Sequence, residues 1–491
     1  MTNNRAKTLR AVGAFTFFGM TVALVASVRN IPDVAATGWT MLFYMIVVTL
    51  LFALPICLMS GEYAGMLPRA GGPELWVNTG LSERWGFTTS WLLWVQMFPG
   101  MVMVASVIAP LLAIAVSHDS LGTNSTFTLI CILATYWTVS ILNIFFDMAR
   151  LGGRLGVILG VYLPIGVMSL LGVAAFIKAG IRPNSYLGHF RMGDLLPLSK
   201  GSVGTLSFFA AIAFIYTGIE MSSVYLPRLK HPVKTYMRGI FMALIFMFLF
   251  NTLLALAFAN DVPSGTIELN NIAQAPLIAL KILGLPSWIA NVFAASVLIG
   301  VVVQLSAWAS GPSKTITDSA QRGDYPPVLR FWKTNKFDVA PAVIVTQALI
   351  ISLFALLFIL IPGVNSAFLL LVTATAVLYI IVYVLMAIGI LRLRTSQPDK
   401  ARPFKMGSNR TAWTIIVVFL ATAAASTFAT LWYQGLSHAV AIVGITLVLT
   451  LAPLIIVRFR KESWRTEVQQ AMGNPTTPTD PEKTDPEKVM V

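Results

Sequence analysis

Twelve long apolar stretches constrain this chain more than any other feature. A helix needs about 20 apolar residues to cross a bilayer, and stretches of that length begin near residues 11, 39, 86, 125, 154, 203, 238, 285, 341, 366, 411 and 437. Only 11% of the residues are charged, against about 25% in soluble domains. Backbone groups inside a bilayer must be paired within the protein, which a helix achieves by itself. We therefore expect an all-α polytopic membrane protein with 12 transmembrane helices.

The basic residues between these stretches predict an orientation. If the first ten residues are cytoplasmic, 28 of the 34 lysines and arginines fall in cytoplasmic segments, as the positive-inside rule requires. An even number of spans then places both ends of the chain in the cytoplasm. We expect residues 1–10 to form the cytoplasmic N-terminus and residues 11–460 to form one transmembrane domain.

The composition changes near the end of the chain. Residues 461–491 are polar and rich in proline, and two Asp-Pro-Glu-Lys units begin at Asp480 and Asp485. Such a segment cannot bury enough apolar surface to offset its loss of conformational entropy. We expect a disordered cytoplasmic tail, and the alternative is a segment that plugs or regulates the cytoplasmic mouth.

Glu220 is a carboxylate within the apolar stretch that runs from about residue 203 to 225. An ionisable group inside a membrane helix costs about 3 kcal/mol even on lenient insertion scales. Gly218, beside it, lets the helix open locally because glycine has no side chain. Glu220 could bind a substrate ammonium or carry a proton. Equally, it could accept hydrogen bonds from a broken helix and never contact substrate.

Two stretches show signs of interruption at corresponding places. The first span contains Gly13, Gly19 and a run of small or polar residues from Thr21 to Ser27, and the sixth contains Tyr216 to Glu220. Their spacing of five spans fits two inverted repeats, spans 1–5 and 6–10, followed by two extra helices. The N-terminal ends of broken helices can face an anionic substrate group such as an amino-acid carboxylate.

Several aromatic and basic residues fall inside or at the ends of spans. Trp308 lies late in the eighth span, and Tyr379 and Tyr383, four residues apart in the tenth, share a helix face. Each could gate a substrate site, although packing between helices is the more common role of one aromatic. Arg29 ends the first span, where attraction of an anionic solute is possible but extension to the membrane interface is the more common role. Glu62, at the cytoplasmic end of the second span, could pair with a basic residue of another cytoplasmic loop.

Other classes of protein are poorly supported. The four histidines, His118, His189, His231 and His438, are scattered without metal-ligand spacing, and no nucleophile motif or catalytic cluster is evident. We expect no catalytic residue, no metal and no cofactor, and therefore not an enzyme. The net charge of +14 is explained by basic cytoplasmic loops rather than by a nucleic-acid partner.

Three stretches in order resemble motifs of the amino acid–polyamine–organocation (APC) transporters. They are Glu62 to Trp76 after the second span, Phe214 to Tyr236 with His231-Pro232, and Ser306-Ala307-Trp308 with the following loop to Pro326. Within that superfamily the chain looks most similar to the glutamate/4-aminobutyrate antiporter branch, which includes bacterial exchangers of amino acids for biogenic amines.

The resemblance implies a LeuT-like 5+5 inverted repeat with the substrate between the two broken spans. The residues that it implies for substrate binding are Thr21, Val22, Ala23 and Leu24 of an unwound part of span 1, Tyr216, Thr217, Gly218, Ile219 and Glu220 of span 6, and Trp308 of span 8. Tyr379 and Tyr383 match gating aromatics of span 10.

One departure from the family pattern bears on the mechanism. Arg154 stands where proton-coupled members often place a lysine. Because an arginine does not deprotonate in proteins, this position favours exchange over proton symport.

The resemblance implies an antiporter of the bacterial inner membrane that exchanges an amino acid for the amine left by its decarboxylation, generating proton-motive force or acid resistance. The candidate pairs are glutamate/4-aminobutyrate, histidine/histamine and tyrosine/tyramine. A proton-coupled amino acid symporter is the alternative.

Overall fold

Residues 12–68, 71–146, 148, 156 and 158–473 are described by a computed structural model of the chain. Regular structure in this part of the chain is entirely helical. Eleven of its helices are long and apolar enough to cross a membrane, and a bent pair of helices near the N-terminus brings the number of spans to twelve. The expected all-α polytopic architecture is confirmed.

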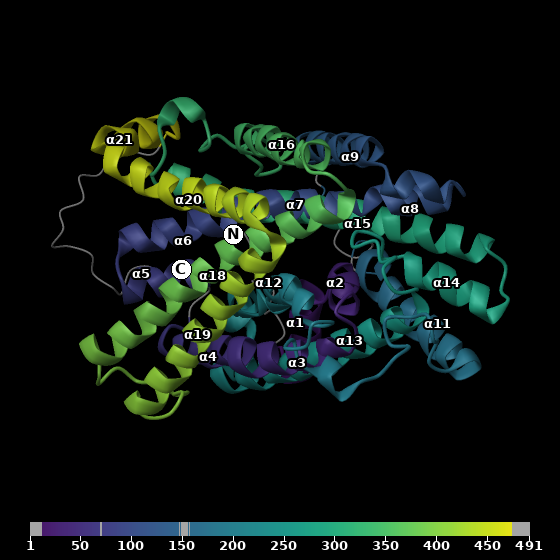
Figure 1. Cartoon of the computed structure of the whole chain (residues 1–491). Coiled ribbons are helices and arrows are strands. Elements are labelled where there is room, and N and C mark those ends of the chain that lie inside the picture. Colours follow the sequence, from purple (N-terminus) through teal and green to yellow (C-terminus); the bar gives the residue numbers. More distant parts are fainter. Residues whose placement is uncertain (1–11, 69–70, 147, 149–155, 157, 474–491) are drawn as a thin grey trace, which may run out of the picture.

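The twelve spans follow one another with few other elements between them. Span 1 is α1 (Ala14–Val25) with a short turn of 3-10 helix (Val28–Asn30) and α2 (Ile31–Ala35). Spans 2 to 6 are Gly38–Met66, which contains α3 (Met41–Val47) and α4 (Leu54–Met66), Glu83–Ala115, which contains α6 (Glu83–Val95), α7 (Met97–Ser106) and α8 (Ile108–Ala115), Ser125–Phe145 (α9), Ile158–Ala179, which ends in α11 (Leu163–Ala179), and Val203–Arg228, which contains α12 (Phe209–Phe214). Spans 7 to 12 are Pro232–Asp261 (α13), Trp288–Gln321 (α15), Pro341–Leu360, which contains α16 (Pro341–Ala355) and α17 (Leu357–Leu360), Val364–Ser396 (α18), Asn409–Gln434 (α19) and Leu436–Phe459 (α20). Short helices α5 (Pro73–Gly80) and α14 (Gln274–Leu283) lie toward opposite ends of the bundle (Figure 1).

Span 1 is broken after α1. Ala26 and Ser27 have extended backbone conformations, and the two halves meet at an angle of 50°. We expected the unwound residues to be Thr21 to Leu24, and this is corrected: they belong to α1, where the Thr21 hydroxyl donates to the Phe17 carbonyl oxygen at 3.0 Å. Pro32 near the start of α2 explains the position of the break, because proline favours the first turn of a helix.

Span 6 is broken close to the expected place. Helix α12 ends at Phe214, a turn follows, and a 3-10 helix resumes at Ile219. Gly218 has φ 88°, in the left-handed region that favours glycine. The backbone N–H of Gly218 donates to the Tyr383 hydroxyl at 2.9 Å, so the break is held by span 10.

Burial separates the central spans from the peripheral ones. In the most apolar part of each span, 89% of the residues of Glu83–Ala115 and 83% of those of Val364–Ser396 are buried, against 17% for α20. The exposed apolar side chains of α19 and α20, such as Trp432, Leu447 and Val448, leave a surface suited to lipid. The third and tenth spans therefore form the centre around which the broken spans pack.

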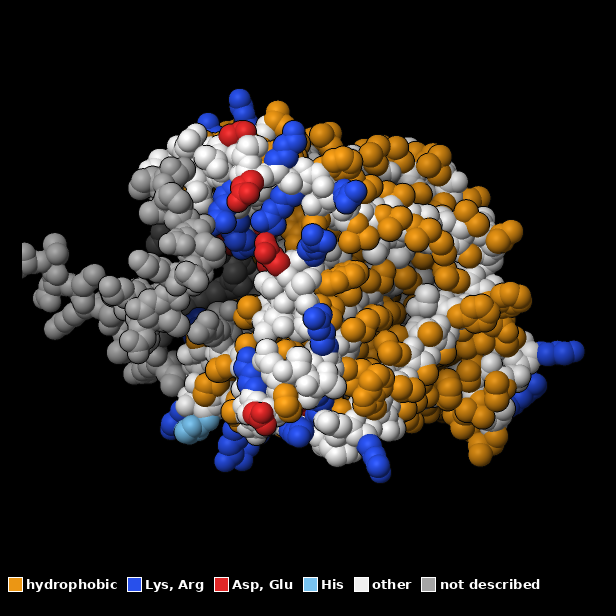
Figure 2. All heavy atoms as spheres, turned by 90° about the vertical axis from the view of Figure 1, so that its left-hand side faces the viewer, with side chains coloured by type: hydrophobic (Ala, Val, Ile, Leu, Met, Phe, Trp, Pro, Cys, Tyr) orange, Lys and Arg blue, Asp and Glu red, His pale blue; other side chains and the backbone are white. Residues whose placement is uncertain are grey.

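One end of the bundle carries a network of charges. Arg460 contacts both Glu83 (3.1 Å) and Asp324 (2.9 Å), and Arg322 contacts Glu74 of α5 at 3.4 Å. Figure 2 shows charged side chains gathered in a band on this face, beside a broad area rich in hydrophobic side chains.

The expected disordered tail also needs correction. Residues Glu462–Ala471 form helix α21. Its Val468 side chain is fully buried, and a Cβ on Gly323 would lie 2.5 Å from Arg465 Cα, so α21 packs tightly against the loop after α15. The tail begins with an amphipathic segment, and the apolar side of that segment explains why it folds. Residues 474–491, with both Asp-Pro-Glu-Lys units, lie outside the described part of the chain.

Candidate functional site

A cavity of about 550 Å³ lies where the two broken spans meet. Its wall combines the break of span 1 around Ser27, the break of span 6 around Gly218, and side chains of the third, eighth and tenth spans. Apolar side chains such as Leu93, Met97 and Phe214 supply much of the lining. The size and mixed lining are typical of small-molecule sites, which measure about 300–1,000 Å³.

Half of the expected site residues line this cavity. Those that line it are Ala23, Leu24, Thr217, Gly218, Trp308 and Tyr379. The others, Thr21, Val22, Tyr216, Ile219, Glu220 and Tyr383, are buried behind its wall. Tyr216, for example, shares a hydrogen bond of 2.5 Å between its hydroxyl and that of Thr49. Arg154 lies outside the described residues.

Glu220 is completely buried and is held by two tyrosines of α18. The Tyr379 hydroxyl donates to Oε1 at 3.0 Å, and the Tyr383 hydroxyl donates to Oε2 at 2.7 Å. No cation of the described chain lies within 4.0 Å of this carboxylate. Because Tyr379 also lines the cavity, its ring and hydroxyl connect Glu220 to the space that a solute would occupy.

Arg29 is a lining residue whose position the sequence did not predict. It is only 4% exposed, so its extension to the membrane interface is excluded in this structure. The Nη1 group donates to Gln304 Oε1 at 2.6 Å, and the guanidinium carbon lies 4.6 Å from the centre of the Trp308 ring. The signal that could have placed it is Pro32, which marks the start of a second half-helix and puts Arg29 just after the break.

Glu62 provides a second completely buried carboxylate away from the cavity. Arg394 donates to it from Nε at 2.8 Å and from Nη2 at 2.5 Å, and Arg402 lies 3.3 Å away. The backbone N–H of Met406 donates to Oε2 at 3.0 Å. The sequence left open a pairing of Glu62 with a basic residue of another loop; Arg402, in the loop after α18, makes such a contact, whereas Arg394 belongs to α18 itself. Together these contacts tie span 2 to the end of span 10.

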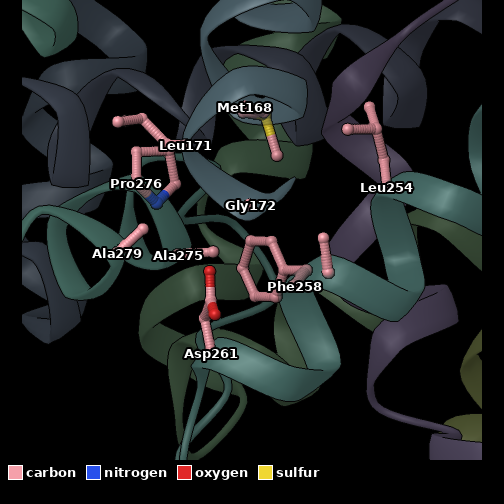
Figure 3. Close-up of a pocket in the computed structure, with 10 residues that line it drawn as sticks. Met168, Leu171, Gly172, Leu254, Phe258, Asp261, Ala275, Pro276 and Ala279 are labelled. Atoms are coloured by element: carbon pink, nitrogen blue, oxygen red, sulfur yellow. The ribbon is translucent and has the colours of Figure 1, made fainter. Parts of the chain in front are cut away.

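A second cavity is far smaller. It measures about 10 Å³, which is room for one water molecule. Figure 3 shows the Asp261 carboxylate directed into this space among apolar side chains of α11, α13 and α14. An amino acid cannot fit there, so the larger cavity is the candidate substrate site.

Comparison with known proteins identifies the family. A family model described as amino acid permease matches residues 12–459. The chain belongs to this family, within the APC superfamily. The family consists of transporters, so the protein is an amino acid transporter that crosses the membrane many times.

Individual relatives point toward the antiporter branch. An uncharacterized transporter of Legionella pneumophila is 28% identical over 416 residues, 83% of this chain and 86% of the relative. A glutamate/gamma-aminobutyrate antiporter of Lactococcus lactis is 26% identical over 83% of this chain and 80% of its own length. A probable agmatine/putrescine antiporter of the same organism is 23% identical over 80% of this chain and 83% of its own.

Proposed function

We propose that this permease is an antiporter of the bacterial inner membrane. It imports an amino acid and exports the product of that amino acid's decarboxylation, with both ends of the chain in the cytoplasm. Decarboxylation inside the cell replaces the departing CO2 with a proton. The cycle therefore consumes cytoplasmic protons and supports proton-motive force or acid resistance.

The cavity between the two broken spans is the observation that carries this proposal. Irregular backbone at membrane depth is tolerated only where it is buried in protein or lines a cavity, and here both breaks contribute to one wall. Paired breaks five spans apart support a LeuT-like 5+5 inverted repeat with two extra helices. Relatives named as antiporters at 23% and 26% identity support exchange rather than uptake alone.

The proposed roles follow from the positions of the residues. Ala23, Leu24, Thr217, Gly218 and Trp308 contact the substrate directly. Thr21, Val22, Tyr216 and Ile219 support that wall from behind. Glu220 acts through Tyr379 and Tyr383, which gate the site: when either tyrosine moves, the carboxylate gains access to a substrate ammonium.

The candidate pairs are glutamate/4-aminobutyrate, histidine/histamine and tyrosine/tyramine. Exchange in proteoliposomes tests the function. Vesicles are preloaded with each amino acid or amine, and labelled amino acid is added outside at acidic and neutral pH. Uptake that requires one matching amino acid or amine inside supports the antiporter. Equal uptake into empty vesicles under a proton gradient identifies a proton-coupled symporter and contradicts it.

A further inference from the structure

The Arg29 guanidinium is a fixed positive charge in the wall of the main cavity. It is nearly inaccessible from outside the protein yet lines the cavity beside Gln304 and Trp308. An arginine stays charged in proteins because its delocalised guanidinium holds its proton very strongly. A buried charge of this kind is costly unless an anion or a set of hydrogen bonds compensates it.

The described residues give Arg29 only neutral partners. Gln304 accepts one hydrogen bond, and the Trp308 ring faces the cation, which offsets part of the cost. No carboxylate of the described chain lies within 4.0 Å of it. Asp33, four residues further along, is also buried, but its two oxygens make no hydrogen bond. The remaining N–H groups of Arg29 therefore suit an anion that comes from the cavity.

We propose that Arg29 binds a substrate carboxylate that survives decarboxylation. A guanidinium presents paired N–H groups in a planar fork that matches a carboxylate. This inference rests on the proposed exchange, because it specifies the substrate class of the same site. The substrate is an amino acid with a side-chain carboxylate, and the product is the ω-amino acid that keeps it.

The chemistry of the three candidate pairs separates them. Decarboxylation of glutamate releases the α-carboxyl group as CO2, adds a proton at that carbon and leaves 4-aminobutyrate with its side-chain carboxylate intact. Histamine and tyramine retain no carboxylate and carry a positive ammonium group. These two amines would add a positive charge to the cavity and leave Arg29 without an anion, whereas the carboxylate of 4-aminobutyrate can pair with Arg29 and offsets the charge of its own ammonium group. The geometry thus selects glutamate/4-aminobutyrate or a pair of the same kind.

The test compares 4-aminobutyrate with n-butylamine, in which a methyl group replaces the carboxylate. Wild-type protein is expected to exchange glutamate for 4-aminobutyrate and to ignore n-butylamine. Arg29→Gln is expected to raise the KM for 4-aminobutyrate roughly ten- to a hundredfold, because the variant loses a hydrogen bond between two charged groups. Arg29→Lys should recover part of the affinity, because it restores the charge but not the fork.

A binding measurement keeps the test independent of transport. 4-Aminobutyrate should raise the unfolding temperature of purified wild-type protein, since a ligand of the native state stabilises it, and should not do so for Arg29→Gln. Arg191→Gln is the matched control, because Arg191 is exposed and does not line the cavity. It should behave as wild type in both assays.

The outcomes distinguish this inference from the function on which it rests. Exchange of histidine for histamine or tyrosine for tyramine by wild type, unchanged in Arg29→Gln, overturns the inference and leaves the antiporter intact. A change in kcat alone, with KM for 4-aminobutyrate and the thermal shift both unchanged, overturns it as well. Uptake into empty vesicles overturns the antiporter, whereas loss of the 4-aminobutyrate thermal shift in Arg29→Gln still supports the carboxylate site.

Discussion

Glu62 and Glu220 are both completely buried carboxylates, but their surroundings differ in charge. Glu62 contacts two arginines and a backbone N–H, so its charge is matched within the protein. Glu220 accepts hydrogen bonds from two neutral tyrosines beside the cavity, and no cation of the described chain reaches it. The first arrangement is closed and structural. The second is the arrangement for which we propose a role in binding the cationic group of a substrate.

Removing the negative charge of Glu62 should have the largest effect on stability. Glu62→Gln removes the negative charge and leaves Arg394 and Arg402 buried without an anionic partner. Loss of one partner of a buried ion pair lowers the free energy of unfolding by about 3–5 kcal/mol. The apparent unfolding temperature of the purified protein should fall strongly. Glu467→Gln, on the exposed face of α21, is the matched control and should leave it unchanged. A Glu62→Gln protein as stable as the control contradicts the structural role.

A substitution at the break of span 6 should have an intermediate effect on stability. Gly218→Ala places a side chain at φ 88°, which costs roughly 1–2 kcal/mol, while the nearest atom to the new Cβ, the Tyr379 hydroxyl oxygen, lies at an ordinary 3.5 Å. The loss therefore comes from the backbone. Gly166→Ala in α11, where a Cβ meets nothing within 4 Å, should stabilise the helix instead. Equal unfolding temperatures for the two variants would show that the break is not held in the left-handed conformation.

Substitution of Glu74, a partly exposed carboxylate, should have the smallest effect on stability. Burial raises the pKa of the Glu74 carboxyl, and Arg322 only partly offsets this. The folded state therefore binds the proton more tightly than the unfolded state, so this group favours folding more as the pH falls. The unfolding temperature of Glu74→Gln should therefore rise relative to that of wild type as the pH increases from about 4 to 6, because the variant carries no buried charge at the higher pH. An unfolding temperature of the variant that falls relative to wild type over this range contradicts the direction of the shift.

The sequence predicted the spans well because apolar length is a local property. Predicted starts at 125, 203 and 341 coincide with the starts of α9, the sixth span and α16. The break of span 6 was also predictable, since a glycine beside a buried acid is visible in the chain. The break of span 1 was placed too early, because glycine and threonine are common in membrane helices and Pro32 was the better signal.

The contacts across the fold were not predictable in the same way. Glu62 and Arg394 are 332 residues apart, and Arg29 and Gln304 are 275 apart. Which side chains meet depends on how each helix is rotated about its axis, and apolar membrane helices carry little amphipathic pattern to fix that rotation. For that reason the sequence suggested an interfacial role for Arg29, although its side chain lies in the cavity wall.

The central claim is that Glu220 serves transport whereas Glu62 serves the fold, and Glu220→Gln tests it most directly. Counterflow of labelled amino acid into preloaded proteoliposomes and the unfolding temperature should be measured on the same preparation. Glutamine keeps the shape and can still accept from a tyrosine, so a folded protein with exchange lost or re-tuned is expected. Near-normal exchange by a folded Glu220→Gln protein would contradict the account.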